Sequence, residues 1–276
     1  RLGELGYTTT AIHPYYGSGW NRNTVYPLLG FDNMIFKDAF TAPKKIRNYI
    51  SDESAFEKII DLYEEKGTDE KLFAFEVTMQ NHGGYSKDTD DFRESVYLTD
   101  ELNQGTQVRA AEKYLTLIQK SDEAFKELVE YFEKQKEPTI ILMFGDHQPS
   151  DYITNVILRE LGLDRDESQD VYFDNYIVPY IMWSNYDMDT TQVENISLNY
   201  LSGLLMEKAG IGLTGYQQFL KDMQAELPVI TANMVMEADG DRKPEKDVQS
   251  EWIENYNKLV YNHLCDKTGK LSGFFE

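Results

Sequence analysis

The sequence has a single cysteine, Cys265, among its 276 residues. One cysteine excludes an internal disulfide framework and any metal site built from several thiolates. Basic residues are also scarce, since 27 Lys and Arg stand against 48 Asp and Glu, for a net charge of −21. A surface of that charge repels a phosphate backbone, so we expect no nucleic-acid partner. It attracts cations instead.

Long apolar runs are missing too. The longest, Ile140–Phe144, is far shorter than the roughly 20 residues that a membrane-spanning helix needs. There is no signal-peptide pattern. Leu2, Leu5 and Gly6 resemble the last turn of a helix and its glycine stop. We therefore expect the chain to be the later part of a longer polypeptide, with any membrane tether outside it.

What is present is a globular composition, with 41% hydrophobic and 13% aromatic residues, and an alternation of strand-like and helical segments. We expect strands at 7–12, 72–79, 139–144 and 177–183, and helices at 24–29, 51–67, 104–136, 152–161, 198–208 and 248–263. The alternation predicts an α/β fold with a mostly parallel sheet and helices on both faces. Segment 139–144 is apolar on both faces, which is typical of a central parallel strand. With no repeat or long linker, residues 1–276 are predicted to form one domain.

Three of the four histidines follow predicted strands directly: His13, His82 and His147. His263 lies in the last predicted helix and is expected to be structural. Ligands of open α/β sheets bind beyond the carboxyl ends of the strands. A lone histidine there is more often a hydrogen-bonding residue than a catalytic one. Three at one edge favour a functional site.

Asp146 and His147 are the sharpest candidates. A carboxylate at the end of an apolar strand is costly unless a cation or hydrogen-bond donors meet it. Oxygen and imidazole nitrogen side by side suit Mn²⁺, Zn²⁺ or a similar ion. The alternative is that Asp146 caps the next segment. Because two ligands do not complete a site, at least two more would have to come from elsewhere.

Trp20, Asn21 and Arg22 form the second candidate element, a few residues past His13. The planar guanidinium fork of Arg22 matches phosphate or carboxylate oxygens, and Trp20 offers a wall for an apolar or polyol group. The structural alternative is a core anchor at Trp20 and a surface ion pair at Arg22. In so acidic a chain, an arginine at the site edge favours an anionic substrate.

Four blocks of the sequence also carry a resemblance: YTTTAIHPYYGSGWNRNTVYPLLGFD, FAFEVTMQNHGGY, ILMFGDHQPS and VPYIMWSNYD. In order and approximate spacing, from residue 1 to about 210, they resemble the extracellular catalytic domain of the lipoteichoic acid synthase family. These enzymes are phosphoglycerol transferases of the alkaline phosphatase/sulfatase superfamily. The resemblance implies an alkaline phosphatase/sulfatase-like fold, here as the C-terminal part of that domain with its N-terminal part missing.

The resemblance implies one divalent cation, Mn²⁺ or Mg²⁺ before Zn²⁺, held by a Glu, a nucleophilic Thr and an Asp–His pair that Asp146 and His147 match. It gives His82 and His13 catalytic-site positions, and makes Trp20, Asn21, Arg22 and His82 substrate contacts. The Glu and the Thr of the family lie upstream of the first block, so we expect weak or absent metal binding and no activity from this chain alone. Thr8, Thr9 and Thr10 lie in a predicted strand and are not taken for the nucleophile.

The implied reaction moves phosphoglycerol from a phosphatidylglycerol-type lipid to threonine and then to a glycolipid or polymer acceptor, at the extracellular face of a bacterial cytoplasmic membrane. The alternatives are a sulfatase, a phosphodiesterase or a phosphoethanolamine transferase on the same fold, or a non-catalytic module. A lectin or cell-wall binding domain is disfavoured, because the aromatic residues do not cluster in repeats.

Overall fold

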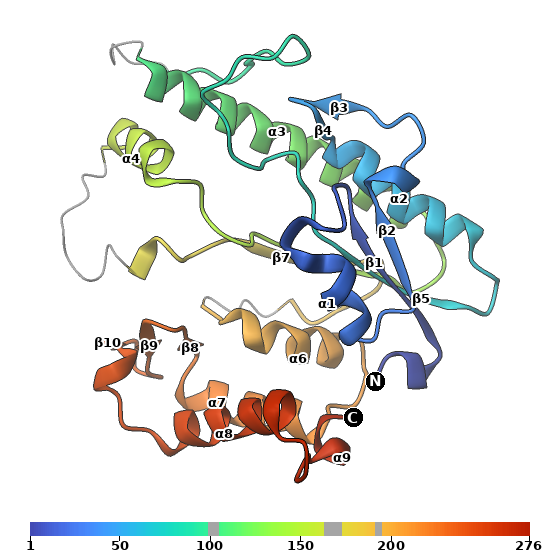
Figure 1. Cartoon of the computed structure of the whole chain (residues 1–276), viewed down its shortest axis with the longest axis vertical. Coiled ribbons are helices and arrows are strands. Elements are labelled where there is room, and N and C mark those ends of the chain that lie inside the picture. Colours follow the sequence, from blue (N-terminus) through green and yellow to red (C-terminus); the bar gives the residue numbers. More distant parts are fainter. Residues whose placement is uncertain (99–104, 163–172, 191–194) are drawn as a thin grey trace. The chain divides into compact units, whose positions relative to one another are not determined.

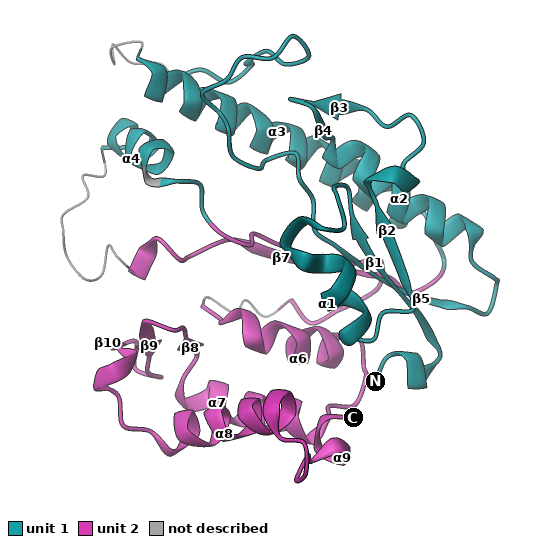
Figure 2. Cartoon of the chain, in the orientation of Figure 1, with its two compact units in different colours: residues 1–136, 148–165 teal, residues 137–147, 166–276 magenta. Residues whose placement is uncertain are grey.

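A computed structural model describes residues 1–98, 105–162, 173–190 and 195–276. The chain forms two compact units (Figure 2). Unit 1 comprises residues 1–136 and 148–165, and unit 2 comprises residues 137–147 and 166–276.

A three-stranded parallel sheet of order β2–β1–β5 forms the centre of unit 1 (Figure 1). Its strands are β1 (Tyr7–His13), β2 (Asn33–Phe36) and β5 (Lys71–Glu76). Thr10 pairs with Asn33 on one side of β1 and with Ala74 on the other. The parallel sheet expected from the sequence is therefore present. Strand β5 ends three residues before the predicted position 79, and β2 was not predicted.

Helices cover both faces of this sheet, as expected. On one face Ile12, Phe40 and Ile50 form a buried cluster with Ile59 and Leu62 of α2 (Asp52–Glu65). On the other face α1 (Arg22–Leu28) places Tyr26 in a stack with Phe36, with ring centroids 6.2 Å apart. Because side chains alternate along a strand, Ile12 points to α2 and the next residue, His13, to the side of α1.

The long helix α3 (Thr106–Phe132) packs against α2 and α4 (Asp151–Glu160). Ala111 and Leu117 of α3 and Ile153 and Val156 of α4 are buried in one cluster. The predicted start at Gln104 lies outside the described residues. Unit 1 also contains four short elements: η1 (Gly3–Leu5), η2 (Gly19–Asn21), η3 (Lys37–Ala39) and the hairpin β3 (Lys45–Ile46) to β4 (Tyr49–Ile50).

In unit 2, β6 (Ile140–Phe144) pairs with β7 (Tyr180–Ser184). The pairing is antiparallel, with Ile140 opposite Ser184 and Phe144 opposite Tyr180. The expectation of a central parallel strand at this position was wrong. Strand β6 is half-buried and its last residue, Phe144, is exposed. The prediction failed because a run of apolar residues indicates a strand but not the direction of the strand beside it.

The remainder of unit 2 consists of α6 (Leu198–Lys208), α7 (Gly215–Glu226), β8 (Val229–Ile230), β9 (Met234–Met236), β10 (Arg242–Pro244), η4 (Glu245–Asp247), α8 (Glu251–Cys265) and α9 (Ser272–Phe275). Helices α6 and α8 match the predicted segments. Helix α7 was missed although Thr214 and Gln217 form a capping box at its start. No helix in the described part of the chain is both long and apolar enough to cross a membrane.

Candidate active site at the ends of β1 and β5

Four of the predicted site residues lie together in unit 1, where β1 and β5 end. The ring of Trp20 is 5.8 Å from that of His13 and 5.6 Å from that of His82, centroid to centroid. The guanidinium carbon of Arg22 lies 4.5 Å from the centre of the Trp20 ring. Segments far apart in the sequence thus meet at the carboxyl edge of the parallel sheet, where α/β folds place their ligands.

His13 is completely buried. Its Nδ1 donates to the carbonyl of Val77 over 2.7 Å, so its Nε2 accepts a hydrogen bond from Nη1 of Arg22 over 3.1 Å. Burial, and then the charge of Arg22, lower the pKa of His13 to about 4 against the partly opposing bond to Val77. At neutral pH His13 is therefore a neutral imidazole whose two nitrogens are both engaged.

Arg22 is fixed from three sides. Besides His13 and the Trp20 ring, its Nε donates to the hydroxyl of Tyr26 over 2.9 Å. No described residue accepts from Nη2, which leaves one end of the guanidinium fork for a ligand. The expectation of a simple surface ion pair at Arg22 finds no support among the described residues.

Trp20 is 58% exposed, so it is not a core anchor. Trp20 and Asn21 both adopt left-handed backbone conformations, with φ of 52° and 57°. This conformation is unusual for side chains larger than glycine and marks backbone that its surroundings hold in place. The bend exposes the Trp20 ring directly before α1, the helix that carries Arg22.

The loop that carries His82 is anchored to helices α2 and α3. Gln80 is buried, and its Oε1 accepts from the backbone N–H of Asp52 over 3.0 Å. Nδ2 of Asn81 donates to Oγ of Ser121 over 2.8 Å. The hydrogen bonds of Gln80 and Asn81 fix the backbone next to His82, and His82 itself is exposed at the edge of the sheet.

Arg47 clamps the same loop from the β3–β4 turn, and sequence reasoning missed it. Its Nη2 donates to the carbonyls of His82 and Gly83 over 3.1 and 3.0 Å. Only 6% of Arg47 is exposed, and its guanidinium carbon lies 4.8 Å from the centre of the Tyr85 ring. Arg47 and Asn48 have φ of 55° and 68°, as a two-residue hairpin turn requires. An Arg-Asn pair between two β-formers is a weak signal for that turn.

Two carboxyls are buried behind this edge. Burial raises the pKa of Asp52 to about 6, although Ser121 and Thr78 donate hydrogen bonds to it. The pKa of Glu76 is raised well above its usual value, first by burial and then by the charge of Asp52. Neither carboxyl oxygen of Glu76 hydrogen bonds to a described residue. Asp52 and Glu76 lie behind the candidate site. Their pKa values are raised, whereas that of His13 is lowered, so acid affects the two carboxyls and His13 in opposite directions.

The three threonines of β1 have structural partners. The backbone N–H and the hydroxyl of Thr9 both donate to Oδ2 of Asp32 over 2.8 Å. The hydroxyl of Thr8 donates to Oε1 of Glu70, and Thr10 is buried. These contacts agree with reading the threonines as strand residues.

Asp146 and His147 lie in unit 2, directly after β6. Their side chains are 72% and 75% exposed, and Nε2 of His147 lies 3.6 Å from Oδ2 of Asp146. Oδ1 of Asp146 accepts from the backbone N–H of His147 over 2.9 Å. No group of three or more His, Cys, Asp or Glu side chains in the described residues is arranged to hold a metal ion. The donor types fit a divalent ion, but two donors are fewer than the four to six that Zn²⁺ or Mg²⁺ takes.

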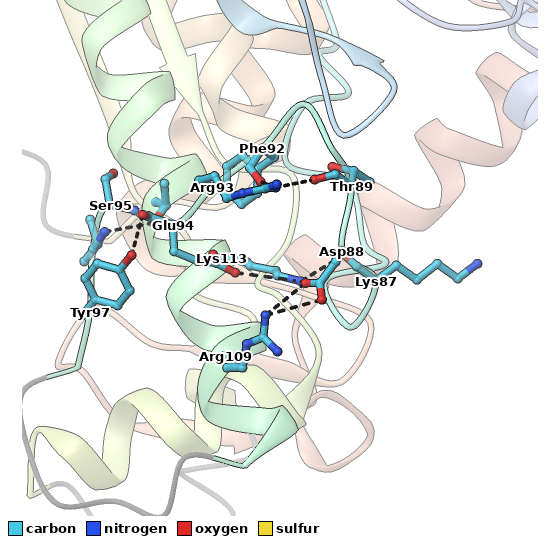
Figure 3. Close-up of polar contacts among 12 residues, drawn as sticks. Lys87, Asp88, Thr89, Phe92, Arg93, Glu94, Ser95, Tyr97, Arg109 and Lys113 are labelled. Carbon is cyan, nitrogen blue, oxygen red and sulfur yellow. Dashed lines mark hydrogen bonds and ion pairs between the residues drawn. The ribbon is translucent and has the colours of Figure 1, made fainter.

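A separate polar cluster at the start of α3 is internally neutralised (Figure 3). Buried Lys113 donates to Oδ1 of Asp88 over 2.6 Å and to the carbonyl of Lys87 over 3.0 Å, and Arg109 reaches Asp88 over 3.2 Å. Lys113 and Arg109 lower the pKa of Asp88. A cavity of about 300 Å³ beside them is lined by Asp88, Thr89, Asp90, Phe92, Arg93, Glu94 and Arg109. Because Lys113 and Arg109 already pair with Asp88, we interpret this cluster as structural: it holds the loop before α3 against the helix.

The sequence profile of the sulfatase family matches residues 2–211. Over 284 aligned residues the chain is 27% identical to a protein of Rhizobium meliloti (strain 1021) whose name refers to cyclic beta-1,2-glucan modification. That alignment covers 98% of this chain and 43% of the relative, so the chain spans less than half of the relative's length.

Two solved structures share the fold. The phosphoglycerol transferase GacH of Streptococcus pyogenes, in complex with sn-glycerol-1-phosphate, superposes with a TM-score of 0.68 at 18% identity, covering 98% of this chain and 65% of that one. The lipoteichoic acid synthase LtaP of Listeria monocytogenes superposes with a TM-score of 0.60 at 16% identity, covering 93% and 68%. The fold is therefore alkaline phosphatase/sulfatase-like, as the sequence blocks implied. Since the family profile spans most of its length, the chain belongs to the sulfatase family.

Proposed function

We propose that this chain is part of a metal-dependent phosphoglycerol transferase that acts on phosphatidylglycerol at the extracellular face of a bacterial cytoplasmic membrane. The observation that carries the proposal is the cluster of His13, Trp20, Arg22 and His82. A stacked guanidinium with one open end beside an exposed indole and an exposed imidazole suits a phosphate that carries a small polyol.

In this proposal each residue has a distinct task. Arg22 binds a phosphoryl oxygen through Nη2, and Trp20 supports the glycerol carbons. Neutral His13 accepts from Arg22 and so fixes the guanidinium, which makes His13 a positioning residue. His82 is exposed next to Trp20 and is the histidine of the cluster that can exchange a proton with a bound alkoxide. Asn21 lies between Trp20 and Arg22 as a further candidate contact.

Asp146 and His147 would fill two positions around the divalent ion that the superfamily uses. When bound, that ion withdraws negative charge from the phosphoryl oxygens and lowers the pKa of the attacking group. We propose that the remaining metal ligand and the nucleophile belong to parts of the protein outside these 276 residues. In keeping with the length of the relatives, we expect residues 1–276 to be a portion of one sulfatase-like catalytic domain, with no transfer activity by themselves.

Binding of glycerol 1-phosphate to this chain tests the site itself. We expect measurable binding by NMR titration, weakened about ten- to hundredfold in Arg22→Met because one charge-assisted hydrogen bond contributes about 1.5–3 kcal/mol. Arg159→Met removes an exposed arginine of α4 in the same unit and should leave binding unchanged. Equal binding by Arg22→Met and the unmodified chain would refute the assigned role.

The reaction class is tested with the full-length protein, supplied in turn with phosphatidylglycerol and an aryl sulfate. Release of diacylglycerol supports the transferase. Sulfate release without it supports the alternative of a sulfatase on the same fold, to which the family match applies equally. Turnover of neither substrate by a folded, metal-loaded protein would favour a non-catalytic module.

A further inference from the structure

Helix α1 of unit 1 exposes three apolar side chains on one face. Val25, Leu28 and Leu29 have the i, i+3 and i+4 spacing that places side chains next to one another on a helix. They are 39%, 82% and 66% exposed, whereas Tyr26 of the same helix is buried. We refer to Val25, Leu28 and Leu29 as the apolar stripe of α1. Single exposed apolar residues are ordinary, but three neighbours on so short a helix indicate an interaction surface.

The stripe continues onto the sheet and lies close to the candidate site. Met34 of β2 is 38% exposed, and it shares the face of the sheet that α1 covers with Phe36, which stacks on Tyr26. The first residue of α1 is Arg22, with the exposed Trp20 ring beside it. Because α1 has seven residues, it is about 10 Å long. The stripe therefore lies within about 10 Å of the residues to which we assign the phosphate.

The segment that contains the stripe differs in charge from the rest of the chain. Residues 5–31 contain no Asp or Glu, which is the longest such stretch in a sequence with 48 acidic residues. Arg22 is the one Lys or Arg among them. The next acidic residue, Asp32, accepts hydrogen bonds from the backbone N–H and the hydroxyl of Thr9. This segment can therefore approach anionic groups that the acidic remainder of the chain repels.

The side chains around the stripe are those that favour a lipid surface. Two exposed aromatic rings each have a cation 4.5 Å from the ring centre, Arg22 at Trp20 and Lys37 at Tyr16. Tryptophan and tyrosine are enriched at the boundary between membrane and water, and basic residues near it are attracted to anionic headgroups. Exposed leucines beside such residues match the upper part of the acyl region.

We infer that the apolar stripe of α1, together with Trp20 and Met34, docks unit 1 on a lipid bilayer that contains anionic headgroups. The inference rests on the proposed function, because it explains how a phosphate that is part of a bilayer reaches Arg22. Leu28 and Leu29 enter the boundary between headgroups and acyl chains. The rest of the chain, with its net charge of −21, is repelled by the same bilayer, and salt screens that repulsion. Moderate salt therefore strengthens the docking.

The test is co-sedimentation of the 276-residue chain with vesicles made of equal parts phosphatidylcholine and phosphatidylglycerol. We expect binding that increases from low to moderate salt. It should be at least about tenfold weaker in the double variant Leu28→Ser, Leu29→Ser, in which two leucine side chains no longer leave water. Leu264→Ser, which removes a 74% exposed leucine of α8, is the matched control and should bind as the unmodified chain does. If the double variant does not fold, Leu28→Ser alone decides the question, with a loss of at least about threefold.

Three results would overturn the inference: no binding of the unmodified chain to these vesicles, undiminished binding of the stripe variants, or equal weakening in Leu264→Ser. Self-association without vesicles, measured by analytical ultracentrifugation and lost in the stripe variants, would also overturn it in favour of a second copy of the chain. Glycerol 1-phosphate, titrated in parallel, separates this inference from the proposed function. Vesicle binding without a glycerol 1-phosphate response would count against the phosphoglycerol site alone, and the reverse pattern would count against the docking surface alone.

Discussion

The two strand ends that carry the predicted site residues differ in how the protein holds them. After β1, His13 is buried and hydrogen bonded through both ring nitrogens to Val77 and Arg22. After β6, the side chains of Asp146 and His147 are about three-quarters exposed, 3.6 Å apart. The first end is buried and held by hydrogen bonds, whereas the side chains at the second end are mostly exposed.

This difference suits the two ends to the separate tasks that we propose for them. A buried imidazole with a pKa of about 4 is poorly suited to exchange protons at neutral pH, but it holds a guanidinium rigidly. Side chains as exposed as those of Asp146 and His147 contribute little to the stability of the fold. The same residue type, histidine at the end of a strand, is therefore held in two different ways, buried in unit 1 and exposed in unit 2.

The largest effect we expect is on stability at the first of these ends. His13→Ala leaves a cavity and removes a hydrogen-bond partner from both Val77 and Arg22, so it should lower the free energy of unfolding by about 2–4 kcal/mol. His147→Ala, a matched change at an exposed position, should stay within about 0.5 kcal/mol. Urea unfolding of both variants measures the contrast. Equal losses would show that the two ends are held alike.

We expect acid to reduce the contribution of His13, at the end of β1, to the free energy of unfolding. Because the folded-state pKa of His13, about 4, lies below the ordinary value of 6.5, the unfolded chain takes up a proton that the folded chain refuses. The stabilising contribution of neutral His13 is complete above pH 6.5 and is lost as the pH falls toward 4, in total on the order of 3 kcal/mol.

The raised pKa values of Asp52 and Glu76 work in the opposite direction, because protonated carboxyls suit their buried sites. The measurement is therefore the difference in unfolding free energy between the unmodified chain and His13→Gln, in which the carboxyl contributions cancel. That difference should shrink from pH 7 to pH 4. A constant difference would mean that His13 is not held neutral.

Arg47 extends the comparison to the His82 loop. Arg47→Met removes two hydrogen bonds to carbonyls from a buried position, and we expect a loss of about 1–3 kcal/mol together with weaker glycerol 1-phosphate binding. Arg93 also donates to two carbonyls, those of Thr89 and Phe92, but is exposed. Arg93→Met should therefore change stability by less than about 0.5 kcal/mol. Similar losses of stability in Arg47→Met and Arg93→Met would mean that the buried hydrogen bonds of Arg47 contribute no more than those of an exposed arginine.

The sequence predicts those parts of the site that local pattern encodes. The alternation of strands and helices indicates the fold class, and the histidines after strands point to the edge where His13 and His82 meet near Trp20. The resemblance of the sequence blocks to a known family adds the expected phosphate chemistry. These signals are carried by residues close together in the chain.

Contacts between segments that are distant in the sequence could not be predicted from local patterns. Arg47 lies 35 residues before His82, and only the left-handed turn of the β3–β4 hairpin brings its side chain to that loop. Tyr15 and Tyr49 look like ordinary β-formers until their rings are seen side by side. The prediction that β6 is a parallel strand was also wrong. The direction of pairing depends on the partner strand and on the connection between the two, which the residues of β6 do not encode.

The smallest effect concerns the second strand end. With two donors from Asp146 and His147 and no larger donor group among the described residues, we expect Mn²⁺ to bind this chain only weakly. An ion concentration at or below the dissociation constant then adds at most about 0.5 kcal/mol to the free energy of unfolding. Calorimetric titration with Mn²⁺ measures the affinity, and Asp146→Asn is the variant that identifies the site. Tight, stoichiometric binding that Asp146→Asn abolishes would mean that the chain completes the coordination shell by itself. The contrast between a self-sufficient end and a dependent one would then fail, and the missing ligands would have to be sought within these 276 residues.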